Sequence, residues 1–243
     1  MTEGTSVHTR LQKSELVAER TMAFHFAKPP GFEFRAGQAI DLTLLNPPET
    51  DAEGNIRTFS LVSAPFDSDL TVATRLRDSA FKRVLSKEQP GLEVKIDGPS
   101  GSLVLHRKTE KPAVLLAGGI GITPYMSIVR QAAHDKTGHQ IYLFYANRRP
   151  EDTPFLDVLT EAAKQNPQFH LIATMTEMEK SQRAWNGETG HIDKKMLLKY
   201  LPAVEGPIYY VAGPPAMVAA MRRILADTGV DDDDVRTEEF SGY

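Results

Sequence analysis

The chain has 243 residues, of which 41% are hydrophobic and 25% are charged, and its formal net charge is −4. This composition is typical of a globular protein with room for two modest domains, and the acidic balance does not support a nucleic-acid partner. The chain has no cysteine, which excludes disulfides, thiolate zinc sites, a cysteine nucleophile and a cysteine-bound iron–sulfur cluster within it.

The N-terminal residues Met1-Thr2-Glu3-Gly4 lack the basic and apolar regions of a signal peptide. No apolar segment approaches the roughly 20 residues that span a bilayer. We therefore expect a cytoplasmic monomer with no membrane partner.

The first 107 residues read as a small antiparallel β-barrel. Residues 38–44 alternate apolar and polar side chains, which is the period of a strand with one buried face. Similar short segments, separated by Pro and Gly turns, predict six strands and one helix in all. The strands are expected over 7–19, 22–26, 38–45, 57–65, 70–76 and 92–96, and the helix over 79–85 with Asp78 or Ser79 as its N-cap.

A buried strand, a glycine turn and a helix start follow one another at residues 113–124. The run Val114 to Ala117 has no polar face, as in a parallel strand covered on both sides. Gly118, Gly119 and Gly121 let the backbone turn sharply, and Thr123-Pro124 opens a helix whose N-terminus favours an anion such as a phosphate. Taken alone, the same pattern also fits a tight turn in any α/β protein.

Strands and helices then alternate to the end of the chain. Strands are expected over 113–117, 140–146, 169–174, 208–212 and 235–240, with helices over 124–134, 155–164, 193–200 and 215–228. Alternation of this kind implies a parallel sheet, in which the loops after the strands share one edge and form a ligand crevice. We expect an α/β domain over 108–243 after a barrel domain over 1–107, with the charged residues 106–111 as the linker.

Four short motifs resemble those of the ferredoxin–NADP reductase family, in its order and spacing. They are Arg57-Thr58-Phe59-Ser60, Gly98-Pro99-Ser100-Gly101, Gly118 to Pro124 and Ala212 to Met217. The resemblance covers nearly the whole chain. It implies a flavin, usually FAD, on the barrel, NAD(P)H on the α/β domain, and hydride transfer from nicotinamide to flavin N5 followed by electron delivery to a second acceptor.

The resemblance also assigns flavin-binding residues. Arg57 matches the arginine at the flavin phosphate, Ser60 the serine near flavin N5, and Phe59 a stacking tyrosine whose hydroxyl is lost here. Further flavin contacts are expected from the rest of that motif, from the next strand and from the small helix facing the phosphates: Thr58, Thr74, Arg75, Ser79, Phe81 and Lys82.

On the nicotinamide side, two glycine turns match the family. They comprise Gly118, Gly119, Gly121, Thr123 and Pro124 in the first turn and Gly213 and Pro214 in the second, where Ala212 replaces a typical cysteine. Arg148 and Arg149 follow the second parallel strand and favour NADPH, whereas Glu177 in the next loop would repel a 2′-phosphate if it points inward.

Family members often end with an aromatic residue over the flavin and a nearby carboxylate that relays protons. Phe240 and Tyr243 are the aromatic candidates, and Glu239 is the candidate carboxylate. The alternative for Glu239 is an ordinary solvated acid near a chain end. None of the seven histidines has metal-ligand spacing, so no metal is expected.

These features predict an FAD-dependent NAD(P)H oxidoreductase that serves a separate acceptor, with ferredoxin or flavodoxin favoured. Reduction of free flavin, a quinone or a haem protein is an alternative, and a flavin-bearing subunit without turnover is another. A basic cluster around the flavin-side helix would dock an acidic redox protein, unless its members are ordinary solvated charges: Arg75, Arg77, Lys82, Arg83 and Lys87.

Overall fold

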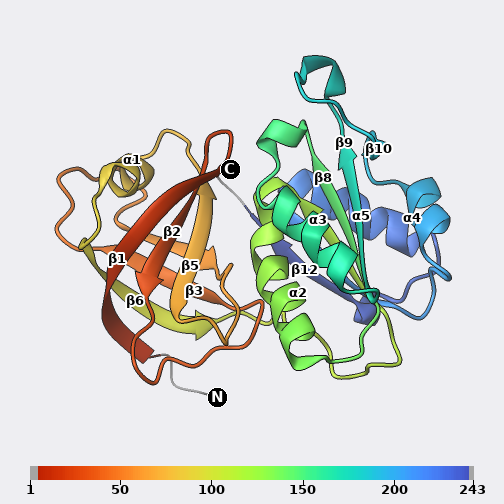
Figure 1. Cartoon of the computed structure of the whole chain (residues 1–243), viewed down its shortest axis with the longest axis horizontal. Coiled ribbons are helices and arrows are strands. Elements are labelled where there is room, and N and C mark those ends of the chain that lie inside the picture. Colours follow the sequence, from red (N-terminus) through yellow and green to blue (C-terminus); the bar gives the residue numbers. More distant parts are fainter. Residues whose placement is uncertain (1–4, 241–243) are drawn as a thin grey trace.

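The computed structural model describes residues 5–240, which form two six-stranded sheets side by side (Figure 1). The first sheet is antiparallel, with the order β4-β3-β6-β1-β2-β5. Its strands are β1 (Thr5–Ala18), β2 (Thr21–Ala27), β3 (Ala39–Leu44), β4 (Ile56–Ser60), β5 (Asp69–Arg75) and β6 (Glu93–Ser100).

The first sheet closes into a barrel just beyond β4. Leu61 forms an isolated antiparallel bridge with Val72 of β5, and the Val62 N–H donates to the Thr71 carbonyl at 2.8 Å. The two edge strands are therefore joined, and the inward side chains form one apolar core that includes Phe24, Phe26 and Ile40. Helix α1 (Ala80–Lys87) packs Phe81 into this core, and Ser79 is its N-cap.

The second sheet is parallel throughout, with the order β10-β9-β8-β7-β11-β12. Its strands are β7 (Ala113–Gly118), β8 (Ile141–Asn147), β9 (Phe169–Met175), β10 (Glu188–Thr189), β11 (Ile208–Gly213) and β12 (Val235–Glu239). The helices are α2 (Thr123–Asp135), α3 (Leu156–Gln165), α4 (Lys194–Tyr200) and α5 (Pro215–Ala226), with short 3₁₀ turns η1 (Gly119–Ile122), η2 (Pro150–Asp152), η3 (Met178–Lys180) and η4 (Asp232–Asp234).

The strand order reverses between β7 and β11. The chain runs from β7 outward through β8, β9 and β10, and then returns to place β11 and β12 on the other side of β7. The turns that follow β7 and β11 therefore meet at the carboxyl edge, where ligands bind in open parallel sheets. This edge faces the barrel, and one apolar cluster crosses the boundary, with Ala23, Val62 and Ala73 packed together with Tyr125 and Phe240.

The fold predicted from the sequence, an antiparallel barrel followed by an α/β parallel sheet, is confirmed. The expected helix over 79–85 is α1, and the expected last strand is β12. Only the two-residue strand β10 had no counterpart in the sequence prediction, because so short a strand carries no periodicity. Within residues 5–240, no helix is both long and apolar enough to cross a bilayer.

Candidate functional site

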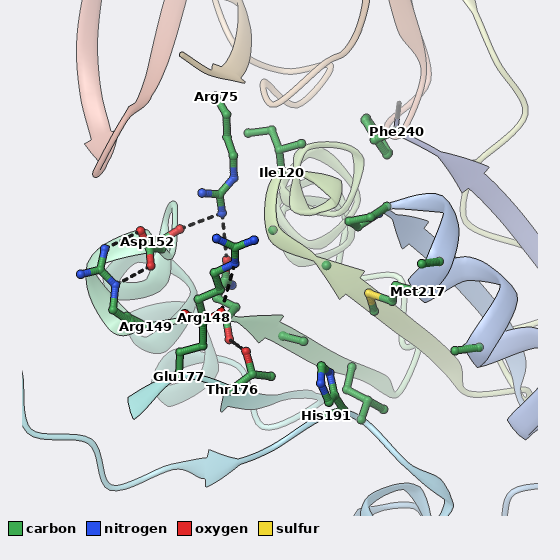
Figure 2. Close-up of a pocket in the computed structure, with 18 of the residues that line it drawn as sticks. Arg75, Ile120, Arg148, Arg149, Asp152, Thr176, Glu177, His191, Met217 and Phe240 are labelled. Carbon is green, nitrogen blue, oxygen red and sulfur yellow. Dashed lines mark hydrogen bonds and ion pairs between the residues drawn. The ribbon is translucent and has the colours of Figure 1, made fainter. Parts of the chain in front are cut away.

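A cavity of about 1120 Å³ opens at the carboxyl edge of the second sheet, against the barrel (Figure 2). We call it the main cavity. Its wall includes the turns after β7, β8, β9 and β11, the end of β5 and one side of α5. The residues that carry the arguments below are Arg75, Gly118, Gly119, Asn147, Arg148, Arg149, Asp152, Glu177, Pro214, Met217 and Phe240.

Gly121 and Gly213 allow the turn after β7 and the turn after β11 to pack closely against each other. A Cβ on Gly121 would lie 2.2 Å from the Ala212 carbonyl oxygen, and one on Gly213 would lie 3.2 Å from Gly118 Cα. The backbones of the two turns are thus in contact between β7 and β11, where the strand order reverses. Thr123 and Pro124 are buried and do not line the main cavity, and the Thr123 hydroxyl donates to the Ile120 carbonyl at 3.1 Å.

Gly119 is the member of the first turn that faces a charged side chain from the barrel. It has a φ of 55°, and a Cβ there would lie 3.2 Å from Nη2 of Arg75. Arg75 ends β5 and reaches across to the second sheet (Figure 2). The sequence placed Arg75 at the flavin edge, and the structure places its guanidinium beside the nucleotide-side turn.

Of the two arginines expected to bind a 2′-phosphate, Arg149 is occupied elsewhere. It pairs with Glu19 of the barrel at 2.7 Å and with Asp152 at 2.8 Å. Arg148 is largely exposed, and its Nε lies 3.5 Å from Glu177 (Figure 2). Neighbouring cations, with Lys180 at 2.7 Å foremost, lower the pKa of Glu177, so a carboxylate lines the main cavity beside Arg148.

A hydrogen bond links the barrel to the last strand of the parallel sheet. The Ser60 hydroxyl donates to Glu238 Oε1 at 2.9 Å, and burial raises the pKa of Glu238. Glu239, the carboxylate chosen from the sequence, is exposed because neighbouring strand residues point to opposite faces. Glu238 and Phe240 share a face. Side chains two residues apart on a strand point to the same face, so the expected strand could have indicated that Glu238, and not Glu239, lies on the side of Phe240.

The arginine expected at the flavin phosphate already contacts the chain's own acids. Arg57 donates to Glu53 Oε2 at 2.7 Å and lies 3.6 Å from Asp51 Oδ1. Asp51 also accepts the Ala80 N–H at the start of α1 at 2.7 Å, a contact that lowers the pKa of Asp51. A carboxylate therefore occupies the anion position that the sequence assigned to a flavin phosphate.

The remaining barrel residues of the expected flavin site are mostly internal. Phe59 is 3% exposed and packs on Phe81 with 5.9 Å between ring centroids, so neither ring presents an open face in this structure. The Thr58 hydroxyl donates to Asp41, and Thr74 is buried. The sequence did not predict that Phe59 points into the barrel core, because an aromatic residue at the end of a strand is compatible with either face of the sheet.

Lys82 is the most unusual residue near α1. Its side chain is buried, and desolvation together with nearby Arg77 and Arg57 lowers its pKa to about 8. Clustered cations of this kind are chemically suited to a polyanion. The phosphate end of a flavin therefore fits the donor set of Arg57, Lys82 and the first turn of α1, provided that Asp51 and Glu53 give way.

The basic cluster predicted as a docking surface is not assembled on one exposed face. Arg75 lies in the main cavity, Lys82 is buried, and Arg83 pairs with Glu49 and with Asp78. Arg75 and Lys82 are thus turned away from any exposed face of α1, and the charge of Arg83 is matched by acids on the surface. Tyr243 lies outside the described residues, and residues 5–240 contain no group of acids and histidines able to hold a metal ion.

The proteins to which this chain is similar include several reductases. The family described as the oxidoreductase NAD-binding domain matches residues 115–223. The chain is 27% identical over 225 residues to the glycine betaine monooxygenase reductase subunit of Chromohalobacter salexigens, covering 91% of this chain and 60% of that protein. It is also 27% identical over 234 residues to NADH-cytochrome b5 reductase 1 of Coccidioides immitis, covering 90% and 73%.

Among solved structures, a ferredoxin NADP+ reductase from Neisseria gonorrhoeae with bound FAD and NADP superposes with a TM-score of 0.79. The match covers 98% of this chain and 99% of that one at 22% sequence identity, a level that establishes the shared fold. The chain spans 60% of the first curated relative and 51% of a flavohemoprotein that follows it, so those proteins contain further segments.

Proposed function

Because the chain belongs to the ferredoxin–NADP reductase-like family, we propose that it binds FAD on the barrel and NAD(P)H in the main cavity. It would pass reducing equivalents from the nucleotide to the flavin and on to a separate acceptor. Flavin, when bound, supplies the exchange between two-electron hydride chemistry and one-electron delivery. The chain supplies alignment of the two cofactors and protection from water.

The observation that carries this proposal is the hydrogen bond between Ser60 and Glu238. It lies where the barrel meets the second sheet, near Phe240, which lines the main cavity. A serine hydroxyl and a carboxylate with a raised pKa are suited to holding a proton beside a reacting ring nitrogen. We assign the proton relay to this pair in place of Glu239.

The flavin phosphate end would be held by Arg57, Lys82 and the first turn of α1. Thr74 and Phe240 would border the ring, and the turns containing Gly119 and Pro214 would hold the nucleotide. These roles follow the family resemblance and the placement of the residues around the barrel end and the main cavity. NADH is the favoured donor, because Arg149 is neutralised by two carboxylates and Glu177 lines the cavity.

For the acceptor, a ferredoxin or a flavodoxin remains the favoured class. A second candidate is the oxygenase component of a two-protein system, which the similarity to the glycine betaine monooxygenase reductase subunit favours. Either acceptor, added to the flavin-loaded chain with NADH, should be reduced at a rate that depends on acceptor concentration. Equal rates with every acceptor would instead favour reduction of free flavin or a quinone.

Stopped-flow mixing under anaerobic conditions tests the core of the proposal. The purified yellow protein should lose its flavin absorbance on mixing with NADH, and more slowly with NADPH. Glu238→Gln keeps the shape of the side chain but removes its titration. The flavin reduction rate of this variant should therefore lose a pH dependence that the unaltered protein shows. A flavin that neither nucleotide bleaches would indicate a subunit without turnover.

A further inference from the structure

Tyr125 is a buried side chain whose hydroxyl group has no hydrogen-bond partner within residues 5–240. It lies in the first turn of α2, just after the glycine turn, and its relative exposure is 0%. Most buried hydroxyl groups in folded proteins make at least one hydrogen bond, because burial without one is unfavourable. A phenylalanine would fill the same space without that cost, so the hydroxyl group itself requires an explanation.

The neighbours of this hydroxyl group lie on the face of the second sheet that is turned toward the barrel. Strands β11 and β12 pair in parallel, with Ala212 opposite Glu238. Ala212 and Tyr125 belong to the apolar cluster that joins the sheet to Val62 and Ala73 of the barrel. Residues paired on neighbouring strands point to the same face, so Glu238 points into the region that Tyr125 covers.

Tyr125 and Glu238 also interact electrostatically. Burial is the main cause that raises the pKa of Tyr125, and interaction with Glu238 and Tyr210 adds to this rise. Burial likewise raises the pKa of Glu238, and the hydrogen bond from Ser60 opposes it. Tyr125 therefore keeps its proton, and remains a hydrogen-bond donor, at the pH at which Glu238 ionises.

The other polar groups on this face already have partners. The Tyr210 hydroxyl accepts from the His106 N–H at 2.8 Å and from Arg236 Nη1 at 3.2 Å, and it lies 2.9 Å from His106 Nδ1. The polar groups of this face around Glu238 are therefore Ser60 of β4, Tyr125 of α2, Tyr210 of β11, Arg236 of β12 and His106 of the linker.

Glu238 uses only part of its hydrogen-bonding capacity within the described chain. Ser60 donates to its Oε1 at 2.9 Å, and this is the one hydrogen bond of the side chain within residues 5–240. An ionised carboxylate accepts several hydrogen bonds, so a second donor on this face would stabilise its charged form. Tyr125 carries the hydroxyl proton on this face that is not used in another hydrogen bond.

We propose that Tyr125 is a positioning residue for Glu238, whose carboxylate receives a hydrogen bond from the Tyr125 hydroxyl group through one bound water molecule. The two side chains are not in direct hydrogen-bond contact, and a water between them would have both as polar partners. This inference rests on the proposed function, in which Glu238 and Ser60 hold a proton. A carboxyl group relays a proton only when both of its forms are accessible, and Tyr125 would stabilise the ionised form that burial disfavours.

Infrared titration of the purified protein tests the inference without any turnover. The absorption band of the protonated Glu238 carboxyl group is identified by its loss in Glu238→Gln. Tyr125→Phe removes one hydroxyl group and should raise the pKa of Glu238 by about one unit, as expected for a lost hydrogen bond to a charged group. An unchanged pKa would overturn the inference.

Tyr209→Phe is the matched control. Tyr209 is the neighbour of Tyr210 on β11 and is 0% exposed, but its hydroxyl group donates to the Val204 carbonyl at 2.6 Å and its side chain lies on the opposite face of the sheet. This variant should leave the pKa of Glu238 unchanged. A rise as large as that in Tyr125→Phe would show that the effect is not specific to Tyr125, and the inference would be wrong.

Tyrosine labelled with ¹³C at Cζ gives a nuclear magnetic resonance readout that needs no substitution at position 125. One tyrosine resonance should move over the same pH range as the Glu238 infrared band, and this movement should be absent in Glu238→Gln. If no tyrosine resonance follows the Glu238 titration, the hydroxyl group and the carboxylate are not linked and the inference fails.

The pH dependence of flavin reduction by NADH separates this inference from the proposed function. Its midpoint should move upward in Tyr125→Phe by the same amount as the infrared midpoint and should stay unchanged in Tyr209→Phe. A pH dependence that disappears in Glu238→Gln but keeps its midpoint in Tyr125→Phe would remove the role of Tyr125 and leave the proton relay standing. A pH dependence that persists in Glu238→Gln would remove the relay and the role of Tyr125 with it.

Discussion

Substitution of Gly121 by alanine tests whether the two glycine turns must touch for the cavity to form. An ideal Cβ at this position would lie 2.2 Å from the Ala212 carbonyl oxygen and 2.8 Å from the Gly213 nitrogen. Both atoms belong to the backbone of β11, so no side chain can rotate away. The turns must separate, and overpacking of this kind destabilises folded proteins by about 1–3 kcal/mol. We expect Gly121→Ala to lose stability in that range and to bind NADH more weakly.

Gly118→Ala is the matched control in the same turn. Its Cβ would meet Met217 Sδ at 2.3 Å and Pro214 Cδ at 3.1 Å, and the methionine side chain can adopt another rotamer. The expected loss is about 1 kcal/mol or less. Urea unfolding monitored by circular dichroism measures both variants. Equal losses in the free energy of unfolding would refute the reasoning. Glycine would then not be required at position 121 by backbone contact between the two turns.

Three further predictions concern cofactors and pH. Glu177→Gln should raise kcat/KM for NADPH relative to NADH, because it removes a carboxylate from the cavity; an unchanged ratio would place the 2′-phosphate elsewhere. Arg57→Gln should purify with little flavin, since the loss of a charge-assisted hydrogen bond costs about 1.5–3 kcal/mol. Asp51→Asn should bind added flavin more tightly, as fluorescence titration would measure, because it removes a negative charge beside Arg57 and the first turn of α1. Burial lowers the pKa of His106 and His139 below 6.5, so the unfolded chain takes up protons first and unfolding free energy should fall as pH drops below that value. Urea unfolding on either side of pH 6.5 measures this fall, and His139→Leu should reduce it.

The sequence alone was sufficient for the architecture and for the neighbourhood of the site. The alternating pattern of residues 38–44 and the wholly apolar run before Gly118 reflect one-sided and two-sided burial, which are local periodicities of the chain. The order of strands and helices then requires the loops after the parallel strands to share an edge. Ser60, Gly119 and Phe240 were placed near the meeting of the two sheets by these arguments and by the family resemblance.

Tertiary structure decided what each side chain does there. Glu238 and not Glu239 meets Ser60, because the register of β12 on β11 determines which face of the strand turns toward the barrel. The sequence motifs assign Arg149 and Arg57 to phosphates, yet both are paired with acids of the chain. Arg149 pairs with Glu19, 130 residues away, and Arg57 pairs with Glu53, four residues away. Ion pairing depends on distances in space, which a linear pattern does not encode. The same reason places Arg75 opposite Gly119, from a different sheet, where only the folded chain brings a guanidinium and a glycine turn together.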